Sequence, residues 1–451
     1  MATKYTKTRI AAAVCAAALG AGLTAPAGAV VVVGGDNGWE VSFDGNVNAF
    51  YTVGNYDKGY VAESHDTHNS RITSGFLPAF FSFNVKSPTI DGMTGSARIS
   101  FAPVIQTGGA KTQLGAATNG APGIQGAQID TREVVANLSG GFGEVSFGRT
   151  LSLFGRNAIL NDMTLFGVGF VPGGDQFGSV TFGRSGNGYT YPDFAARFQY
   201  TTPVVSGFQA AFGIYDPSNV AGLTARGVSG SGIGGLLDKT DKPRFEGEIS
   251  YSTAFTGGNF KTWMDGLWQD IDSTCQGNSL VKISAVIGAP TAQCGSMRTQ
   301  AWGVGTKVGY QGFEVVGYYH RDEGLGEATQ FVGDGVWFDS QGNLHERKGQ
   351  GYYVQGTYTF AGKTKVGVSY GEGNLDSING FTDANGVTHA FAGGGVTTHH
   401  MERSLWTVGV YHDVSSWLRL IAEYNRGELN NNDGAHAPQA NTFSVGSFLF
   451  W

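Results

Sequence analysis

The chain has 451 residues, of which 72 are glycine, 12% are aromatic and only 14% are charged, with a formal net charge of −7. Length alone would allow about three domains, but no linker divides the chain, because Gly- and Asn-rich stretches occur throughout it. The negative charge and the lack of a basic patch exclude a nucleic-acid-binding protein. After residue 29 no apolar run is long enough for a transmembrane helix.

The first 29 residues have the pattern of a secretory signal peptide. Three cations stand in the first nine residues, the apolar stretch Ile10–Leu23 follows, and Ala27-Gly28-Ala29 provides a small-residue cleavage site. The apolar stretch of 14 residues is shorter than the roughly 20 that a membrane-spanning anchor needs. We predict that residues 1–29 are removed on export and that residues 30–451 form one β-barrel domain.

The rest of the chain alternates between apolar and polar residues over many short segments. Examples are residues 39–51, 93–101, 302–310 and 417–425. In the third segment, one face carries Trp302, Val304, Val308 and Tyr310, and the other carries Gly303, Gly305, Lys307 and Gly309. A period of two predicts strands with two different environments. In a soluble protein the apolar face would be core, whereas in a membrane barrel it faces lipid and the polar face lines water.

The connections between these segments alternate between short and long. The short ones are Pro88–Gly92, Ser139–Gly143, Pro203–Gly207, Thr256–Gly258, Gln311–Gly312, Ala361–Lys363 and Val414–Ser416. The long ones are Gly54–Ser74, Gln106–Ile129, Thr150–Asn187, Asp216–Pro243, Ile271–Ser296, Arg321–Gln350, Gly371–Arg403 and Arg426–Ala440. Outer-membrane barrels have short periplasmic turns and longer extracellular loops, so this alternation favours a barrel over a soluble sandwich.

The predicted fold is therefore an all-β, antiparallel, up-and-down transmembrane barrel of about 16 strands. An even strand number is typical of a single-chain bacterial barrel, and about 16 strands leave an open aqueous lumen. Aromatic residues near predicted strand ends suggest a girdle at the membrane interfaces. They are Tyr51, Trp263, Tyr310, Tyr358, Tyr411 and Trp417.

Three motifs, in order along the chain, resemble the general porins of Gram-negative bacteria. The first is the hairpin Arg132–Arg149, with a Gly-Phe-Gly turn and a Gly-Arg end; the second is Tyr200–Phe208, with Pro203 and Gly207; the third is the segment from Tyr411 to the end. In such porins the last strand is read by the outer-membrane assembly machinery, and this implies a signal at Phe443, Phe448, Phe450 and Trp451. The chain departs from the family pattern at its end, with Trp451 in place of Phe and Leu449 where Tyr is common.

The resemblance implies a water-filled homotrimeric pore in the outer membrane, in contact with lipid and lipopolysaccharide, for passive diffusion of small hydrophilic solutes and ions. It also implies that the third long loop, after the fifth strand, folds inward and opposes acidic groups to arginines on the wall. On this basis Arg132 and Arg149 match motif positions, Asp162 and Asp175 lie on the loop, and Arg98 joins them by strand parity alone. The expected constriction thus comprises Arg98, Arg132, Arg149, Asp162 and Asp175.

Cys275 and Cys294 share one predicted long loop. An oxidising envelope permits a disulfide between them, and the alternative is two unpaired thiols. A metal or redox role is not favoured, because the spacing is not Cys-x-x-Cys and no histidine lies between them.

No cofactor, metal or catalytic site is predicted. Gly230–Gly235 fits a dinucleotide-binding pattern but lacks the strand–turn–helix setting that such a site needs. His389, His399 and His400 share a loop at an open spacing without cysteine. The chain is therefore predicted not to be an enzyme. The alternatives left open are a substrate-selective channel, a structural or adhesive barrel, and a barrel enzyme with its catalytic groups at the rim.

Overall fold

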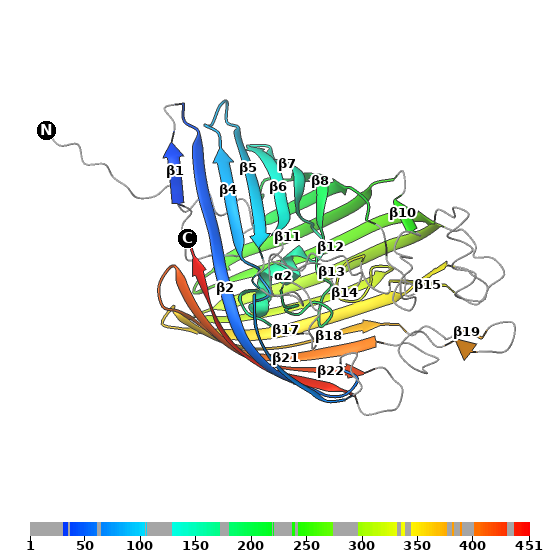
Figure 1. The fold of residues 1–451 in the computed structure, drawn as a ribbon. Helices are drawn as coiled ribbons and strands as arrows, with labels where there is room; N and C mark the ends of the chain where they lie inside the picture. Colours follow the sequence, from blue (N-terminus) through cyan, green and yellow to red (C-terminus); the bar gives the residue numbers. More distant parts are fainter. Residues whose placement is uncertain are drawn as a thin grey trace, which may run out of the picture.

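The computed structural model describes residues 30–34, 37–60, 65–103, 105, 129–171, 180–218, 220, 237–239, 242–273, 296–331, 335–338, 344–376, 381–382, 388–389, 401–430 and 437–451. Most of these residues belong to antiparallel strands, and Figure 1 shows the strands side by side in one sheet that curves round on itself. The predicted signal peptide lies outside the described residues.

Sixteen wall strands make up this sheet when β3 and β4 are counted as two halves of one strand. They are β2 (Glu40–Tyr56), β3 (Thr67–Thr73) with β4 (Phe80–Lys86), β5 (Thr94–Pro103), β6 (Ile129–Gly140), β7 (Gly143–Leu151), β8 (Phe194–Thr201), β9 (Phe208–Tyr215), β11 (Arg244–Phe255), β12 (Gly258–Ser273), β13 (Ser296–Tyr310), β14 (Phe313–Glu323), β17 (Lys348–Phe360), β18 (Thr364–Leu375), β21 (Met401–Asp413), β22 (Leu418–Asn430) and β23 (Gln439–Phe450). Each pairs antiparallel with the next, and β23 pairs with β2 over Asn46–Tyr56, which closes the barrel. The predicted fold is confirmed.

Shorter strands lie outside this ring. β1 (Val30–Gly34) pairs with the start of β2, and β10 (Leu237–Lys239) pairs with the end of β12. Two small hairpins are β15 (Val336–Phe338) with β16 (Leu344–Glu346) and β19 (Phe381–Thr382) with β20 (Thr388–His389). All of them are additions to the rims and loops of the closed barrel.

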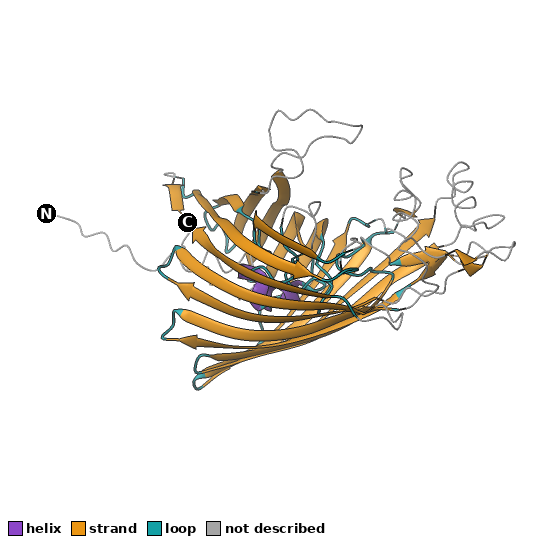
Figure 2. Cartoon of the chain, turned by 60° about the horizontal axis from the view of Figure 1, so that its bottom comes forward, coloured by secondary structure: helices purple, strands orange, loops and turns teal. Residues whose placement is uncertain are grey.

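The short turns gather at one end of the barrel. All seven predicted short connections fall between consecutive wall strands, and Figure 2 shows tight loops joining neighbouring strands at one rim. The β13–β14 turn illustrates the local chemistry: Gln311 and Gly312 have φ angles of 48° and 89°. Two consecutive positive φ angles match the right-handed twist of the flanking strands in a two-residue hairpin.

The second wall strand is interrupted, which the sequence did not reveal. Residues 67–73 were expected in a long loop but form β3, and residues 74–79 break the strand before β4. Within the break, Phe76 N–H donates to Gly167 O at 2.9 Å and Leu77 N–H to Leu165 O at 3.2 Å. These backbone groups therefore bond to a segment inside the barrel instead of to a neighbouring strand.

The alternation of side chains follows the predicted faces. On β13, Trp302 and Val304 are 43% and 41% exposed on the outside, whereas Gly303 and Gly305 face the interior. The predicted aromatic girdle needs a correction. Trp263 and Tyr411 are each 2% exposed and point inward, because their strand positions belong to the lumen face.

The helices are short and lie within the barrel. They are α2 (Arg156–Asn161) and the 3₁₀ helix η1 (Met163–Phe166), and Figure 2 shows the purple helical segment enclosed by the strands. Among the described residues no helix is long and apolar enough to cross a membrane. The interior apolar contacts join Ile159 and Leu165 of these helices to Tyr318 and Tyr353 of the wall.

Candidate functional site: the narrowed lumen

The segment after the fifth wall strand folds into the barrel, as the family resemblance implied. We call residues 152–193 the inner loop, of which the structure describes 152–171 and 180–193. Its bounds differ from the predicted Thr150–Asn187, because β7 ends at Leu151 and β8 begins at Phe194. Arg244 of β11 holds both ends of the loop. Its guanidinium lies 3.0 Å from the Asp193 carboxylate and donates to Ser152 Oγ at 3.2 Å.

Buried carboxylates of the wall accept hydrogen bonds from the backbone of the inner loop. Glu246 of β11 accepts from Phe154 N–H at 2.8 Å, and Glu423 of β22 accepts from Val168 N–H and Gly169 N–H, each at 2.9 Å. Both carboxylates belong to residues that are 1% exposed. Charge-assisted hydrogen bonds are stronger than neutral ones, so these two glutamates fix the loop at widely separated points.

Strand β17 fixes the helical part of the inner loop. The Tyr353 hydroxyl donates to Ala158 O at 2.8 Å, at α2. Gln355 uses both ends of its amide, since Nε2 donates to Asn161 O at 2.7 Å and Oε1 accepts from Met163 N–H at 2.9 Å. One side chain thereby binds the end of α2 and the start of η1, which sets how far the loop projects into the lumen.

Asp162 stands between α2 and η1 and is only 4% exposed. Its carboxylate accepts from Thr164 N–H at 2.9 Å, from the Thr164 hydroxyl at 2.6 Å and from the Tyr189 hydroxyl at 2.9 Å. The Arg184 guanidinium lies 3.9 Å away, and Arg184 also donates to Leu405 O of β21 at 2.9 Å. Burial raises the pKa of Tyr189 well above its usual range, and the Asp162 charge raises it further, so the phenol stays protonated and keeps donating.

A water-accessible chamber of about 460 Å³ separates the inner loop from the wall. On the loop side it is lined by Leu160, Asn161, Asp162, Met163, Leu165 and Phe166. On the wall side its charged lining consists of Lys307, Glu314, Lys365 and Arg419, from β13, β14, β18 and β22. Residues of the β11–β12 and β13–β14 turns also line it, which places the chamber toward the short-turn rim.

Three of these wall charges have defined partners. Lys307 Nζ lies 2.8 Å from Glu314 Oε2. Arg419 forms a two-point pair with Asp413, with Nε–Oδ1 at 2.6 Å and Nη2–Oδ2 at 3.1 Å. The side chains of Lys307 and Arg419 remain 20% and 13% exposed, so both present charge to the chamber.

Arg98 lies in a separate ion-pair network on the wall. Its guanidinium contacts Asp44 of β2 at 2.8 Å and Glu133 of β6 at 2.8 Å, and it also donates to Asn84 Oδ1 at 2.9 Å. These contacts place it on the lumen face, as strand parity predicted. Its described partners are wall residues, and Asp162 is not one of them.

The other two predicted arginines occupy different settings. At a bulge, Ser100 pairs with Glu133 and Phe101 with Thr131, so Arg132 is the extra residue. Arg132 pairs with Asp130 at 2.7 Å and donates to the hydroxyl of Tyr191, on the returning limb of the inner loop, at 2.9 Å.

Arg149 is exposed and alternates with buried Ser146 and Thr150. It shares the outward parity of Val145 and Phe147, which are 36% and 46% exposed. Because side chains on one strand point alternately to opposite faces, its position turns away from the lumen. Neither Arg132 nor Arg149 is among the residues that line the chamber.

Three residues of the predicted sites, Asp175, Cys275 and Cys294, lie outside the described residues. His399 and His400, for which no site was predicted, lie outside them as well. In the described part of the chain, no group of three or more His, Cys, Asp or Glu side chains is arranged to hold a metal ion.

The terminal aromatic residues are divided between the two faces of β23. Phe443 is 49% exposed on the outside, whereas Phe448 and Phe450 are 0% and 5% exposed and point inward. The inward pair stacks at 5.4 Å, and each ring meets Phe166 of the inner loop edge-on, at 5.8 Å and 6.0 Å. The last strand therefore supports the inner loop as well as closing the barrel.

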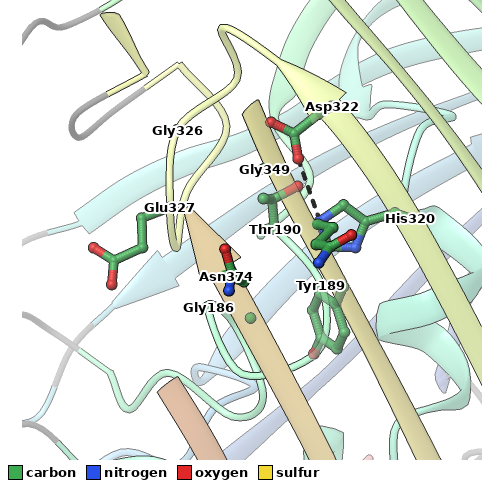
Figure 3. A pocket seen from close by; sticks show the side chains of 11 residues that line it. Gly186, Tyr189, Thr190, His320, Asp322, Gly326, Glu327, Gly349 and Asn374 are labelled. Atoms are coloured by element: carbon green, nitrogen blue, oxygen red, sulfur yellow. Dashed lines mark ion pairs between the residues drawn. The ribbon is translucent and has the colours of Figure 1, made fainter. Parts of the chain in front are cut away.

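A second, much smaller cavity lies beside the returning limb of the inner loop. Figure 3 shows Tyr189 and Thr190 facing His320 and Asp322 of β14, with Glu327 and Asn374 nearby. His320 Nε2 lies 3.4 Å from Asp322 Oδ2. With a volume of about 10 Å³, this cavity has room for about one water-sized group and is too small for a solute path.

The charged wall residues of the chamber that sequence reasoning did not assign are Lys307, Glu314, Lys365 and Arg419. The sequence contained a signal for Lys307, because the alternation over residues 302–310 assigns it to the polar face of its strand. Strand parity shows that a residue faces the lumen but not which part of the inner loop it meets. That information depends on the path of the loop, which only the structure gives.

Comparison with known proteins agrees with this architecture. A family model of Gram-negative porins matches residues 10–433. No curated protein matches the chain. Among solved structures, the outer membrane channel DcaP of Acinetobacter baumannii is similar, with 14% identity over 94% of this chain and 100% of that one and a TM-score of 0.58.

Two further structures share the fold. The anion-selective porin from Comamonas acidovorans has 14% identity over 92% of this chain and 100% of its own, with a TM-score of 0.52. OmpF of Salmonella typhi, solved in complex with daunomycin, has 11% identity over 94% of this chain and 100% of its own, also with a TM-score of 0.52. At these identities the structures support the fold, and the family match extends over nearly the whole chain. The chain belongs to the family of Gram-negative porins, and it is an outer-membrane channel for the passive diffusion of small solutes.

Proposed function

We propose that small hydrophilic solutes and ions pass between the inner loop and the wall formed by β12 to β22. The single observation that carries this proposal is the chamber of about 460 Å³ lined by both the loop and the wall. The loop is fixed by Glu246, Glu423 and Gln355, so the width of the passage is set by hydrogen bonds and not by a movable lid. Transport needs no catalysis, and we propose that the protein is not an enzyme.

Charges on the lumen face are proposed to select among ions. Charged walls in a narrow passage focus the field and concentrate counterions. Near the chamber the wall carries Lys307, Lys365 and Arg419 together with Glu314. Of the constriction residues predicted from sequence, we retain Asp162, which lines the chamber, and Arg98, which lies in its own network on the lumen face.

Membership of the porin family also supports a proposal for how the channel is exported and assembled. The mature chain is expected to begin near Val30, to insert through the outer-membrane assembly machinery and to form a homotrimer in contact with lipid and lipopolysaccharide. The exposed apolar side chains on the outer face, among them Trp302 and Val304, support contact with lipid. Intact mass and native electrophoresis of purified protein test these points.

Single-channel recording in planar bilayers tests the proposed path. The wild-type protein is expected to produce discrete open steps, and liposomes that contain it should swell in sugars at rates that fall with sugar size. Narrowing the chamber with Gly309→Trp should reduce the step size, because Gly309 lines the chamber. The matched control is Gly356→Trp, on the outward-facing parity of β17, where a Cβ would meet nothing within 4 Å.

If the wild-type protein produced no discrete current steps, the proposal that it forms a channel would be wrong. Equal conductance in the two glycine variants would place the path elsewhere in the barrel. The alternative of a substrate-selective channel has one specific observation in its favour, which is the uneven chemistry of the two sides of the chamber.

A further inference from the structure

The two sides of the chamber differ in chemistry. The inner loop contributes the apolar side chains of Leu160, Met163, Leu165 and Phe166. The facing wall contributes Lys307, Lys365 and Arg419. Met163 and Leu165 are almost fully buried, so the apolar surface that the loop presents comes mainly from Leu160 and Phe166. An apolar surface beside a basic one points to a solute with both an apolar part and a charge.

The charge balance of the wall favours anions. Lys307 is paired with Glu314 and Arg419 with Asp413. The Lys365 ammonium approaches the ring of Tyr411, at 5.1 Å from its centroid. In the described part of the chain, no ion pair or hydrogen bond joins Lys365 to a carboxylate. Among the described residues of this wall, Lys365 is therefore the chamber cation without an ion-pair partner of its own, and the charges of Glu314 and Asp413 act on it from a greater distance.

Asp162, on the inner-loop side of the chamber, does not neutralise the cations of the wall. The Asp162 carboxylate is turned toward Thr164 and Tyr189 and lies 3.9 Å from Arg184. A further wall cation, Lys261 of β12, stands directly opposite Lys307 in the strand register and donates to the Asn157 amide oxygen at 2.6 Å. In the lining of the chamber, three cations (Lys307, Lys365 and Arg419) stand against two acids (Glu314 and Asp162), so cations are in excess there.

The apolar side is held rigidly next to this charge. Phe166 contacts Phe448 and Phe450 edge-on, and the Arg419 guanidinium lies over its ring, 5.0 Å from the centroid. A solute that occupies the chamber can therefore place an apolar body near Phe166 and an anionic group near Arg419 and Lys365 at the same time.

We infer that the chamber is a binding site for small organic anions that carry an apolar body, such as aromatic or branched aliphatic carboxylates. The carboxylate binds at Lys365 and Arg419, and the hydrocarbon part packs on Leu160 and Phe166. Chloride and acetate can bind only to the basic side chains. Neutral sugars have neither the negative charge nor the apolar body that the site would bind. This inference rests on the proposed function, because it assigns a solute class to the same passage.

Reversible reduction of the single-channel current by added solute measures this binding. The probes are benzoate, acetate and benzyl alcohol, which provide the ring with the charge, the charge alone and the ring alone. Benzoate is expected to reach half-reduction at a concentration about tenfold lower than acetate, since partial burial of a ring contributes roughly that factor. Benzyl alcohol should have little effect.

Two variants separate the two sides of the site. Lys365→Gln should raise the concentration of benzoate that halves the current by about fivefold. Leu160→Ser should raise the same concentration to nearly the value for acetate. The control is Lys86→Gln, which removes the same charge from β4, outside the chamber, where Lys86 pairs with Glu40 at 4.0 Å. Heat-modifiable migration in gels verifies that each variant has assembled.

The outcomes are distinct. Open channels in which benzoate and acetate act alike would overturn this inference and leave the proposed function standing. A benzoate effect that Lys365→Gln and Lys86→Gln reduce equally would also overturn it, because the effect would then come from overall charge. Loss of all channel activity in the wild-type protein would contradict the proposed function itself.

Discussion

The carboxylate of Glu423 accepts a hydrogen bond from the backbone N–H of Gly169 at 2.9 Å, although 254 residues separate the two in sequence. The same oxygen accepts from Val168 N–H, and the other carboxylate oxygen accepts from the Tyr411 hydroxyl. One wall residue thereby fixes the inner loop at Val168 and Gly169, near the end of its first limb (residues 152–171). The inner loop is thus held to the barrel wall by hydrogen bonds, and mutation of Glu423 tests this attachment.

Glu423→Ala is expected to release this limb. Loss of hydrogen bonds to a buried charged group should lower the free energy of unfolding by about 2 kcal/mol, and the freed limb should make the single-channel current noisier. Urea unfolding and noise analysis measure the two effects. Glu428→Ala, at the end of the same strand, is the control and should behave as wild type. A quiet, stable Glu423→Ala channel would show that the loop does not depend on this contact.

Asp162→Asn is expected to shift ion selectivity toward anions. The substitution leaves the buried Arg184 charge without its neighbouring carboxylate and so adds positive charge beside the chamber. Reversal potentials across a salt gradient measure the shift, which should shrink as the screening length falls from about 10 Å at 0.1 M to about 3 Å at 1 M salt. Asp91→Asn, in an exposed turn, is the control. If the reversal potential of Asp162→Asn were unchanged, Asp162 would not contribute to the ion selectivity of the pore.

Much of the wall was predictable from the sequence, because period-two alternation and turn chemistry are local. The short turns and the lumen faces of Lys307 and Arg419 follow from such patterns. The break at residues 74–79 does not, since the lost ladder bonds are replaced by bonds to Gly167 and Leu165, about 90 residues further along the chain.

The surroundings of individual residues also depend on contacts that are distant in sequence. The bulge at Arg132 cannot be seen in an alternation of side chains, and its contact with Tyr191 depends on the returning limb of the inner loop. Trp263 resembles an interfacial aromatic in the sequence, but Gly305 on the adjacent strand leaves room for its ring inside the barrel. Tertiary partners decide these positions, and the sequence pattern alone does not identify them.

A disulfide between Cys275 and Cys294 remains a prediction. In the chain-entropy description, closing a loop of about 20 residues contributes roughly 3 kcal/mol. Replacing both cysteines by serine should leave the conductance unchanged and make the loop more sensitive to protease. Mass spectrometry after alkylation under non-reducing conditions gives the direct answer, and two alkylated thiols would contradict the prediction.

Gly45 is expected to tolerate no side chain where the barrel closes. A Cβ there would stand 2.3 Å from Phe80 O and 2.5 Å from Cζ2 of Trp451. Gly45→Ala should therefore destabilise the barrel by about 1–3 kcal/mol through overpacking, seen as unfolding at a lower temperature in a gel-shift assay. Gly356→Ala, at a strand position with open space around the built Cβ, is the matched control. Equal melting of the two variants would show that the β2–β23 junction adapts easily.

Removal of Phe450 and Trp451 is expected to block insertion into the outer membrane while export continues. Trp451 exchanges two backbone hydrogen bonds with Gly45, both at 3.2 Å, and its ring packs on Phe43 and Phe81 at 5.8 Å and 5.1 Å. Phe450 supports Phe166 of the inner loop. The truncated chain thus loses the closing contacts of the last strand together with a support of the constriction, and it should accumulate in the periplasm.

Fractionation with a heat-modifiability assay measures this accumulation. Leu449→Tyr, an outward-facing change on the same strand, is the control that should still assemble. Insertion of the truncated chain at the wild-type level would show that neither the closing contacts nor a terminal signal at these two residues is required for assembly.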